Sequence, residues 1–314
     1  MDYSVLGGWV NNPEGIKSYA AKVGSVSDYG LFCSIGQKDI YLWQPLIEMK
    51  PNWKRGAQGI GDCVSWGGEL AETMLLAIQA KAGISEWIEE VATESNYGGC
   101  RVEVYNKSSG GYQDGATGYG MAQWALKGGI ILRLDYSKET GNPEHDLRVY
   151  SADKAKAWGN FGCGGKNDKG KLDEIARKYP VKGVAQVQTI EEVLAAISNG
   201  YPVTIASMAG FGNMRRDKDG IVRRSGSWAH QMLIAGIRWF NGKPLFRIFQ
   251  SWGNSCGTDN DLGINDKEIS KCSWWATESD VNWILKSGDC WSFADAQGFP
   301  PRKLDFLEAF QTWG

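Results

Sequence analysis

The sequence predicts an α+β protein, in which helices come first along the chain and strands come later. Between positions 60 and 200 apolar residues recur at helical spacing, whereas after Gly200 they gather in short runs rich in β-branched and aromatic residues. Because the two kinds of segment do not alternate, a parallel sheet of β-α-β units is disfavoured. The 314 residues supply ample apolar material for a core shared by two parts.

The first predicted helix begins at Cys63. Asp62 is a suitable N-cap residue, and Leu70, Met74 and Ile78 repeat on one helical face. Gly83 follows as a stop signal. Cys63 therefore lies at a helix N-terminus.

Two further helices follow in the same half of the chain. One covers the stretch GYGMAQWALK and ends before Gly128-Gly129. The other starts at Thr189, which forms a capping-box pattern with Glu192, and stops at Gly200. The polar, glycine-rich positions 135–175 between these two helices are predicted to be an inserted loop.

The strand-like runs after Gly200 are YPVTIASM, WAHQMLIAGIRWF and PLFRIFQSW, separated by turns with glycine and charged residues. From this distribution of helix-like, polar and strand-like segments we predict three regions. They are an N-terminal extension (1–50), a core (51–256; helical about 51–135, insertion about 135–175, β-rich about 180–256) and a tryptophan-rich C-terminal extension packing on the β-rich part (257–314).

Composition argues against several partners. The formal net charge is only −2, with both signs mixed, so we expect no nucleic-acid or membrane partner. None of the seven cysteines forms a Cys-x-x-Cys pair, and we expect neither a metal nor a cofactor. No signal peptide or membrane-spanning run is evident, which predicts a cytoplasmic protein or a component of a virus particle.

Two residues stand out as candidates for nucleophilic chemistry. His230 is one of only two histidines, and it interrupts an apolar strand where a polar side chain needs a partner. A helix N-terminus lowers the pKa of a thiol by about one unit, so Cys63 needs a cationic neighbour to become a good nucleophile. We expect His230 to be that neighbour.

The order of several motifs resembles the papain-like cysteine peptidases. The stretches are PNWKRGAQGIGDCVSW, SSGGYQDGATGYGMAQWALKGGI, TIEEVLAAISNGYPVTIASM, SWAHQMLIAGI and FRIFQSWGNSCG. They are similar, in this order, to the family's cysteine helix, its Gly-Gly segment, the helix before its Gly-Pro-Val strand, its histidine strand and its Asn-Ser-Trp-Gly strand. The resemblance runs from about Pro51 to Trp252. It implies a two-subdomain fold, with a helical left subdomain, an antiparallel, β-barrel-like right subdomain and a cleft between them.

The resemblance also implies a thiol-dependent hydrolase that cleaves peptide bonds in a polypeptide substrate. Cys63 would be the nucleophile and His230 the general base and acid. Gln58 would help to bind the oxyanion, and Gln250 would orient the imidazole.

Three further residues would bind the substrate or shield the site. Trp252 would cover the imidazole, while Gly110 and Gly111 would let a substrate strand approach the backbone. Gln250 stands where the family has asparagine, and its longer side chain predicts a less firmly held imidazole.

Other hypotheses stay open. A catalytically weak or inactive domain could serve as a structural or binding module, for example in a virion or other viral or bacterial assembly, with partners bound through the tryptophan-rich termini. The 15 tryptophans also fit sugar stacking, and a carboxylate pair for glycoside hydrolysis has no local sequence signal.

Overall fold

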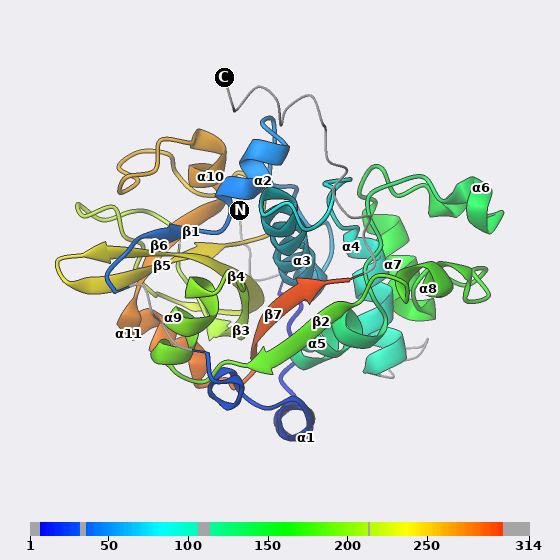
Figure 1. Ribbon diagram of the computed structural model, residues 1–314, viewed down its shortest axis with the longest axis horizontal. Helices are drawn as coiled ribbons and strands as arrows, with labels where there is room; N and C mark the ends of the chain where they lie inside the picture. Colours follow the sequence, from blue (N-terminus) through cyan, green and yellow to red (C-terminus); the bar gives the residue numbers. More distant parts are fainter. Residues whose placement is uncertain (1–6, 32–35, 106–113, 213, 298–314) are drawn as a thin grey trace.

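A computed structural model describes residues 7–31, 36–105, 114–212 and 214–297 (Figure 1). The predicted α+β class is confirmed: a mainly helical side, on the right in Figure 1, adjoins an antiparallel sheet on the left and in the centre. The helices are α1 (Pro13–Val23), α2 (Gln44–Met49), α3 (Cys63–Lys81), α4 (Thr93–Gly98), α5 (Gly118–Lys127), α6 (Ser137–Thr140), α7 (Ala152–Phe161), α8 (Lys171–Ala176), α9 (Ile190–Ser198), α10 (Lys267–Cys272) and α11 (Glu278–Leu285).

The sheet is open and its neighbouring strands are antiparallel, in the order β2-β7-β3-β4-β5-β6, with β1 also paired to β4. Its longest strand, β4, carries His230, which lies opposite Ser207 of β3. The strands are β1 (Ile40–Tyr41), β2 (Val181–Gln186), β3 (Val203–Ala209), β4 (Ser227–Phe240), β5 (Lys243–Phe249), β6 (Ser273–Thr277) and β7 (Cys290–Ala296).

Local sequence signals placed the predicted helices correctly. Helix α3 begins at Cys63 with Asp62 at the N-cap position, but the Asp62 side chain makes no capping hydrogen bond and instead accepts the Tyr150 hydroxyl at 2.9 Å. The Thr189 hydroxyl accepts the Glu192 backbone N–H at 3.2 Å, and the Glu192 carboxylate accepts the backbone N–H of Thr189, which completes the predicted capping box of α9. The three predicted strand runs form β3, β4 and β5.

The expected loop at 135–175 is partly helical, so that prediction was wrong for α6, α7 and α8. Ser151 caps α7 by accepting the backbone N–H of Lys154, and Ala155 and Trp158 turn one face of α7 inward. His145, from the same stretch, is fully buried against Trp158. The sequence pattern did not indicate α7 because its few apolar residues are separated by charged ones.

The predicted region boundaries near 50 and 256 remain predictions, but strands from both flanks belong to the one sheet. β1 pairs with β4, and β7 lies between β2 and β3. The end of the sheet beside the helices is therefore built partly from the C-terminal segment, with β7 next to the edge strand β2 (Figure 1).

Helix α3 runs through the middle of the molecule and is buried along nearly its whole length (Figure 1). It carries two carboxylates into the core, and each has a partner. Arg55 forms an ion pair with Glu69 at 2.6 Å, and Asn96 donates to Glu72 at 2.7 Å. Burial raises the pKa of Glu72 to about 8.

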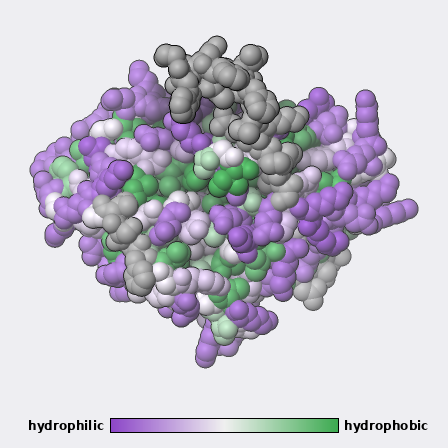
Figure 2. Space-filling view, viewed as in Figure 1, coloured by the Kyte–Doolittle hydropathy of each residue, from purple (hydrophilic) through white to green (hydrophobic). Residues whose placement is uncertain are grey.

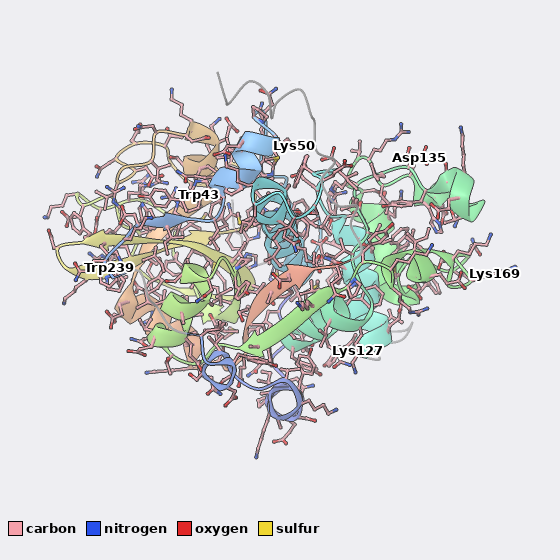
Figure 3. All side chains as sticks on the ribbon, in the orientation of Figure 1. Trp43, Lys50, Lys127, Asp135, Lys169 and Trp239 are labelled. Atoms are coloured by element: carbon pink, nitrogen blue, oxygen red, sulfur yellow. The ribbon has the colours of Figure 1, made fainter. Side chains whose placement is uncertain are left out.

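Charged residues lie mainly on the periphery. Figure 2 shows hydrophilic residues around the margin of one face and hydrophobic residues gathered toward its middle. Lys127, Asp135 and Lys169 are exposed on the helical side (Figure 3). No helix within the described ranges is both long and apolar enough to cross a bilayer.

Candidate active site

Cys63 lies at the first position of α3 and its side chain is completely buried. Burial raises the pKa of its thiol to about 12. The backbone N–H groups of Gln231 and Gly8 face the sulfur and lower the pKa, but the loss of water outweighs them. In this form of the molecule, Cys63 is a neutral thiol at pH 7.

His230 is also completely buried, on strand β4. Burial lowers the pKa of its imidazole to about 3, so the ring is neutral. Within the described residues neither ring nitrogen has a hydrogen-bond partner. Burial thus disfavours the thiolate and imidazolium pair expected from the sequence.

The start of α3 and the middle of β4 are joined directly. The Gln231 side-chain amide donates to the backbone carbonyl of Val64 at 2.9 Å. These residues are the immediate neighbours of His230 and Cys63 in sequence. The structure thus brings the two predicted catalytic residues to one seam between the helical side and the sheet.

Gln250 makes no hydrogen bond to the imidazole, whose two nitrogens have no partner among the described residues. Its side-chain amide nitrogen donates to the Gly253 carbonyl at 3.0 Å and to the Ser255 hydroxyl, and its oxygen accepts the backbone N–H of Trp252. The longer glutamine side chain turns back toward its own loop and forms hydrogen bonds with the backbone groups of Trp252 and Gly253.

Gln58 lies on the loop before α3. This loop is hydrogen-bonded to the loop after β5. The Gln58 backbone N–H donates to the Ser251 carbonyl at 2.8 Å, and its side-chain oxygen accepts the Ser251 hydroxyl. Its side-chain nitrogen donates to the Ile60 carbonyl at 2.8 Å. A role for Gln58 at an oxyanion remains a prediction.

Trp252 takes the covering position expected for it. Its ring stacks on the His230 ring, and Trp228 meets it edge-on at 4.8 Å between ring centroids. Only 5% of Trp252 is exposed. These two indoles contribute to the complete burial of the imidazole.

Gly110 and Gly111 lie outside the described residues. The backbone that faces the seam on the helical side is Gly115-Ala116, immediately before α5. Two hydrogen bonds fix the backbone of Gly115. Its N–H donates to the Tyr97 hydroxyl at 2.8 Å, and its carbonyl accepts from the Arg101 guanidinium.

A segment that sequence reasoning missed fills the seam. We call Gly7–Val10 the strap. The Trp9 backbone N–H donates to the carbonyl of Ala229 at 3.1 Å, on the sheet side. The strap also pairs in parallel with Ala116 on the helical side: the Val10 N–H donates to the Ala116 carbonyl, and the Ala116 N–H donates to the Gly8 carbonyl, both at 2.8 Å. The only available sequence signal was the glycine pair before Trp9.

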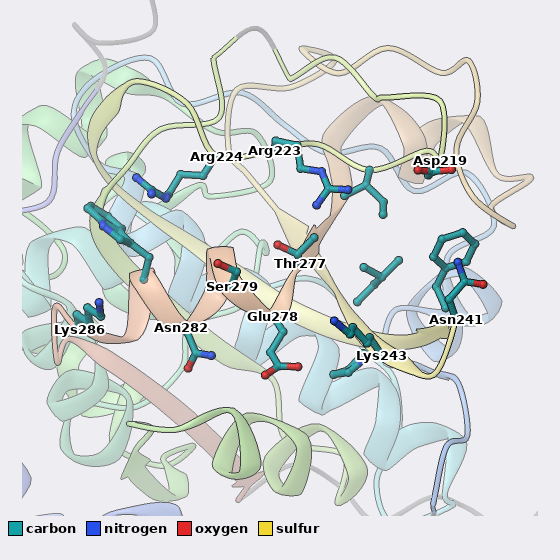
Figure 4. A pocket seen from close by; sticks show the side chains of 15 residues that line it. Asp219, Arg223, Arg224, Asn241, Lys243, Thr277, Glu278, Ser279, Asn282 and Lys286 are labelled. Atoms are coloured by element: carbon teal, nitrogen blue, oxygen red, sulfur yellow. The ribbon is translucent and has the colours of Figure 1, made fainter.

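Other features of the molecule lie apart from this seam. A hollow of about 780 Å³ opens between the β4–β5 hairpin and α11 (Figure 4). Neither Cys63 nor His230 lines it. No cluster of three or more His, Cys, Asp or Glu suited to a metal occurs among the described residues. The charged side chains around the hollow are Asp219, Arg223, Arg224, Lys243, Glu278 and Lys286.

Comparison with known proteins identifies the fold. No protein-family model and no curated protein matches the chain. Among solved structures, xylellain, a cysteine protease from Xylella fastidiosa, aligns over 92% of this chain and 91% of its own, with a TM-score of 0.53 and 15% identity. This chain has the papain-like fold.

Two more structures with the papain-like fold align over nearly the whole chain. Procathepsin B S9 from Trypanosoma congolense covers 95% of this chain and 85% of its own, at 11% identity and a TM-score of 0.52. Digestive procathepsin L 3 of the Tenebrio molitor larval midgut covers 93% and 96%, at 13% identity and a TM-score of 0.50. The papain-like fold expected from the motif order is confirmed, and these low identities place the chain far from all three in sequence.

Proposed function

We propose that this protein is a thiol-dependent hydrolase that cleaves peptide bonds through an acyl-enzyme on Cys63. One observation carries the proposal: in a papain-like fold, the thiol at the start of α3 and the imidazole on β4 meet the same seam, tied by the Gln231–Val64 hydrogen bond. A nucleophile at a helix N-terminus next to a base is the arrangement that thiol acylation needs.

The proposed reaction begins when a peptide and water enter the seam. Hydration lowers the pKa of Cys63 and raises that of His230, so the thiol proton moves to the imidazole. The sulfur attacks the peptide carbonyl, and the backbone N–H of Cys63, with the Gln58 amide, would stabilise the oxyanion. His230 then protonates the leaving amine as the C–N bond breaks.

Water completes the cycle. His230 takes a proton from the water, whose oxygen attacks the thioester carbonyl. The C–S bond then breaks, the carboxylic acid departs as the second product, and the imidazolium returns its proton to the sulfur. The thiol is regenerated, so no cofactor is consumed. Trp252 would limit access of other water to the imidazole.

A second proposal is that the domain is catalytically weak and acts as a structural or binding module. Two observations favour it: Gln250 gives the imidazole no hydrogen bond, and burial keeps both catalytic candidates uncharged. Under this alternative, the tryptophan-rich termini would contact assembly partners.

Hydrolysis of a mixed peptide library separates the two. Four chains are compared: the wild type, the Trp9→Ala variant, and each of these with Cys63→Ala added. Trp9→Ala removes the indole that anchors the strap. We expect cleavage that Cys63→Ala abolishes and that Cys163→Ala, which removes another buried thiol on the helical side, leaves intact. Equal turnover with and without Cys63 would end the thiol mechanism, and no cleavage by any chain would favour the module.

A further inference from the structure

We propose that Tyr150 and Asp62 form a positioning pair for the thiol site: the Tyr150 hydroxyl holds the loop before α3, and the Asp62 carboxyl group anchors that hydroxyl beside the nucleophile. The inference rests on the proposed function, because it adds two residues to the same site. Tyr150 comes from the stretch 135–175, for which the sequence indicated only a loop. The contacts of the hydroxyl, the contacts of the ring and the burial of the carboxyl group support the pair.

The Tyr150 hydroxyl joins the two segments that precede Cys63. It donates to the Oδ2 atom of Asp62 at 2.9 Å, and it accepts the backbone N–H of Gly59 at 3.2 Å. Gly59 follows Gln58, the residue expected at the oxyanion, and Asp62 directly precedes the nucleophile. One side chain therefore ties the loop that carries Gln58 to the first turn of α3.

Two neighbours orient the Tyr150 ring. The Trp66 ring of α3 meets it edge-on with centroids 4.9 Å apart, and the Arg133 guanidinium lies 5.9 Å from its centroid. The next residue is fixed as well, because the Ser151 N–H donates to the buried Glu94 carboxylate at 2.9 Å. Tyr150 is therefore preorganised, as a residue that positions an active-site loop must be.

The loop and the stretch 135–175 also contact each other through Gly59. A Cβ atom added to Gly59 would lie 2.7 Å from the Cβ atom of Ala152, the first residue of α7. A methyl group fixed to a helix backbone cannot move aside as the end of a long side chain can, so the backbone must shift. Gly59→Ala should therefore push the loop away from the Tyr150 hydroxyl, which gives a second way to break the same contact.

The carboxyl group of Asp62 would oppose the thiolate if it were charged. Two negative charges on adjacent residues repel each other, so an ionised Asp62 raises the pKa of Cys63. The Asp62 side chain is completely buried. Burial raises its pKa to about 8, although the Tyr150 hydroxyl lowers it, so the carboxyl group is mostly neutral at pH 7. At neutral pH it therefore anchors Tyr150 without placing a charge beside the sulfur.

The groups around the pair keep Asp62 uncharged near pH 7. Burial raises the pKa of the Tyr150 phenol above its usual range, so the hydroxyl stays a donor. The Glu94 charge raises the pKa of both members of the pair, and the Arg133 guanidinium forms an ion pair with Glu94 at 3.2 Å. Other titratable side chains that interact with the Asp62 charge are Cys63, Tyr97 and Cys100.

The role of Tyr150 is measured by comparing two reactions of Cys63 in the full-length chain, in its wild-type and Trp9→Ala forms. Acylation by the p-nitrophenyl ester of N-acetylglycine passes through an oxyanion, and it is followed by nitrophenolate release after subtraction of the Cys63→Ala rate. Alkylation by iodoacetamide passes through no oxyanion. Because both reactions consume the thiolate, the ratio of their rates reports the positioning of the loop and not the amount of thiolate.

We expect Tyr150→Phe to lower the ratio of acylation to alkylation about tenfold, and Gly59→Ala to lower it as well. Tyr41→Phe is the matched control, because it removes a tyrosine–aspartate hydrogen bond of 3.0 Å to the exposed Asp39, and the ratio should stay the same. A wild-type ratio in either Tyr150→Phe or Gly59→Ala, with circular dichroism showing an intact fold, would overturn the role of Tyr150.

The role of Asp62 is measured by the pH dependence of the alkylation rate. Asp62→Asn keeps an acceptor for the Tyr150 hydroxyl but cannot ionise, so we expect the apparent pKa of Cys63 to fall by about one unit. Asp39→Asn is the matched control and should leave the profile unchanged. An unchanged profile in Asp62→Asn would overturn the role of Asp62, because a carboxyl group that only supports the fold would give this result.

The two measurements separate this inference from the proposed function. If the ester acylates Cys63 but Tyr150→Phe changes nothing, the positioning pair fails and the thiol mechanism stands. If Cys63 is alkylated but never acylated, the proposed function fails and the role of Tyr150 fails with it. The profile of Asp62→Asn then still decides whether Asp62 controls the charge beside the thiol.

Discussion

The imidazole of His230 stacks on the indole of Trp252, with ring centroids 4.3 Å apart and planes inclined by 28°. Trp228 meets the Trp252 ring edge-on. Because this arrangement excludes water and offers the imidazole no carboxylate, the charged form of His230 is strongly disfavoured. The pH dependence of stability follows from this contact.

Stability should fall on the acid side because of His230. Burial lowers its pKa from 6.5 to about 3, so the unfolded chain binds a proton between these values and the folded chain does not. The contribution is intact above pH 6.5 and is lost progressively as the pH falls toward 3. From pH 7.5 to 5.0 the expected loss is about 2 kcal/mol.

Urea unfolding at both pH values, in the wild type and in His230→Gln, isolates this effect. The difference in unfolding free energy between the two chains should shrink by about 2 kcal/mol at pH 5.0. Other buried groups titrate in both chains and cancel. A difference that stays constant would show that the imidazole is not buried as described.

The Arg55–Glu69 ion pair should matter for stability, since each side chain is only 4% exposed. Arg55→Ala leaves Glu69 charged and unpaired in the core, and we expect a loss of about 3–5 kcal/mol in the free energy of unfolding. Lys81→Ala is the control, because the Lys81–Glu48 pair is about half exposed, and we expect a change below about 1 kcal/mol. Similar values for the two, measured by denaturant unfolding, would contradict the burial of the first pair.

Tyr97 should hold the Gly115-Ala116 backbone in place. Tyr97→Phe removes the acceptor for the buried Gly115 N–H, which should lower the free energy of unfolding by about 1–3 kcal/mol. The looser backbone should also speed alkylation of the Cys63 thiol. Tyr29→Phe is a matched control, since that hydroxyl bonds to the Val23 carbonyl from an exposed ring. The expectation fails if both variants behave alike in unfolding and in labelling.

Gln250 should act on its loop more than on the imidazole. Gln250→Ala removes its bonds to Trp252, Gly253 and Ser255, so we expect lower stability. The pH at which Cys63 becomes reactive in the Trp9→Ala chain should stay the same. An acid or alkaline shift of that profile by a full pH unit in Gln250→Ala would restore the orienting role expected from the sequence.

The fold was predictable, and so was the placement of Cys63 at a helix start and of His230 on a strand, because most of these signals are local. Asp62 at a helix start and the Thr189 capping box mark helix ends within a few residues, and His230 stands out because it interrupts an apolar strand. The motif order then supplied the fold. The helix and strand signals are each contained within a few residues, and the motif order alone uses segments far apart in the chain.

What the sequence could not predict depends on distant segments meeting. The strap reaches Ala229 and Asp289 across more than 200 residues, and no spacing rule connects them. Helix α7 was missed because its polar residues outnumber its inward-facing ones. The direction of the Gln250 side chain was equally hidden, because an extra methylene allows the amide to turn either way.

The central claim is that Cys63 and His230 act as one catalytic unit, and a kinetic double-mutant cycle tests it most directly. Peptide hydrolysis is measured for the Trp9→Ala chain with Cys63→Ala, with His230→Ala and with both substitutions. Each single substitution should abolish most of the rate, and the double variant should be no slower than the slower single one, because residues of one unit fail together. Losses that multiply, or substantial turnover in either single variant, would contradict the account.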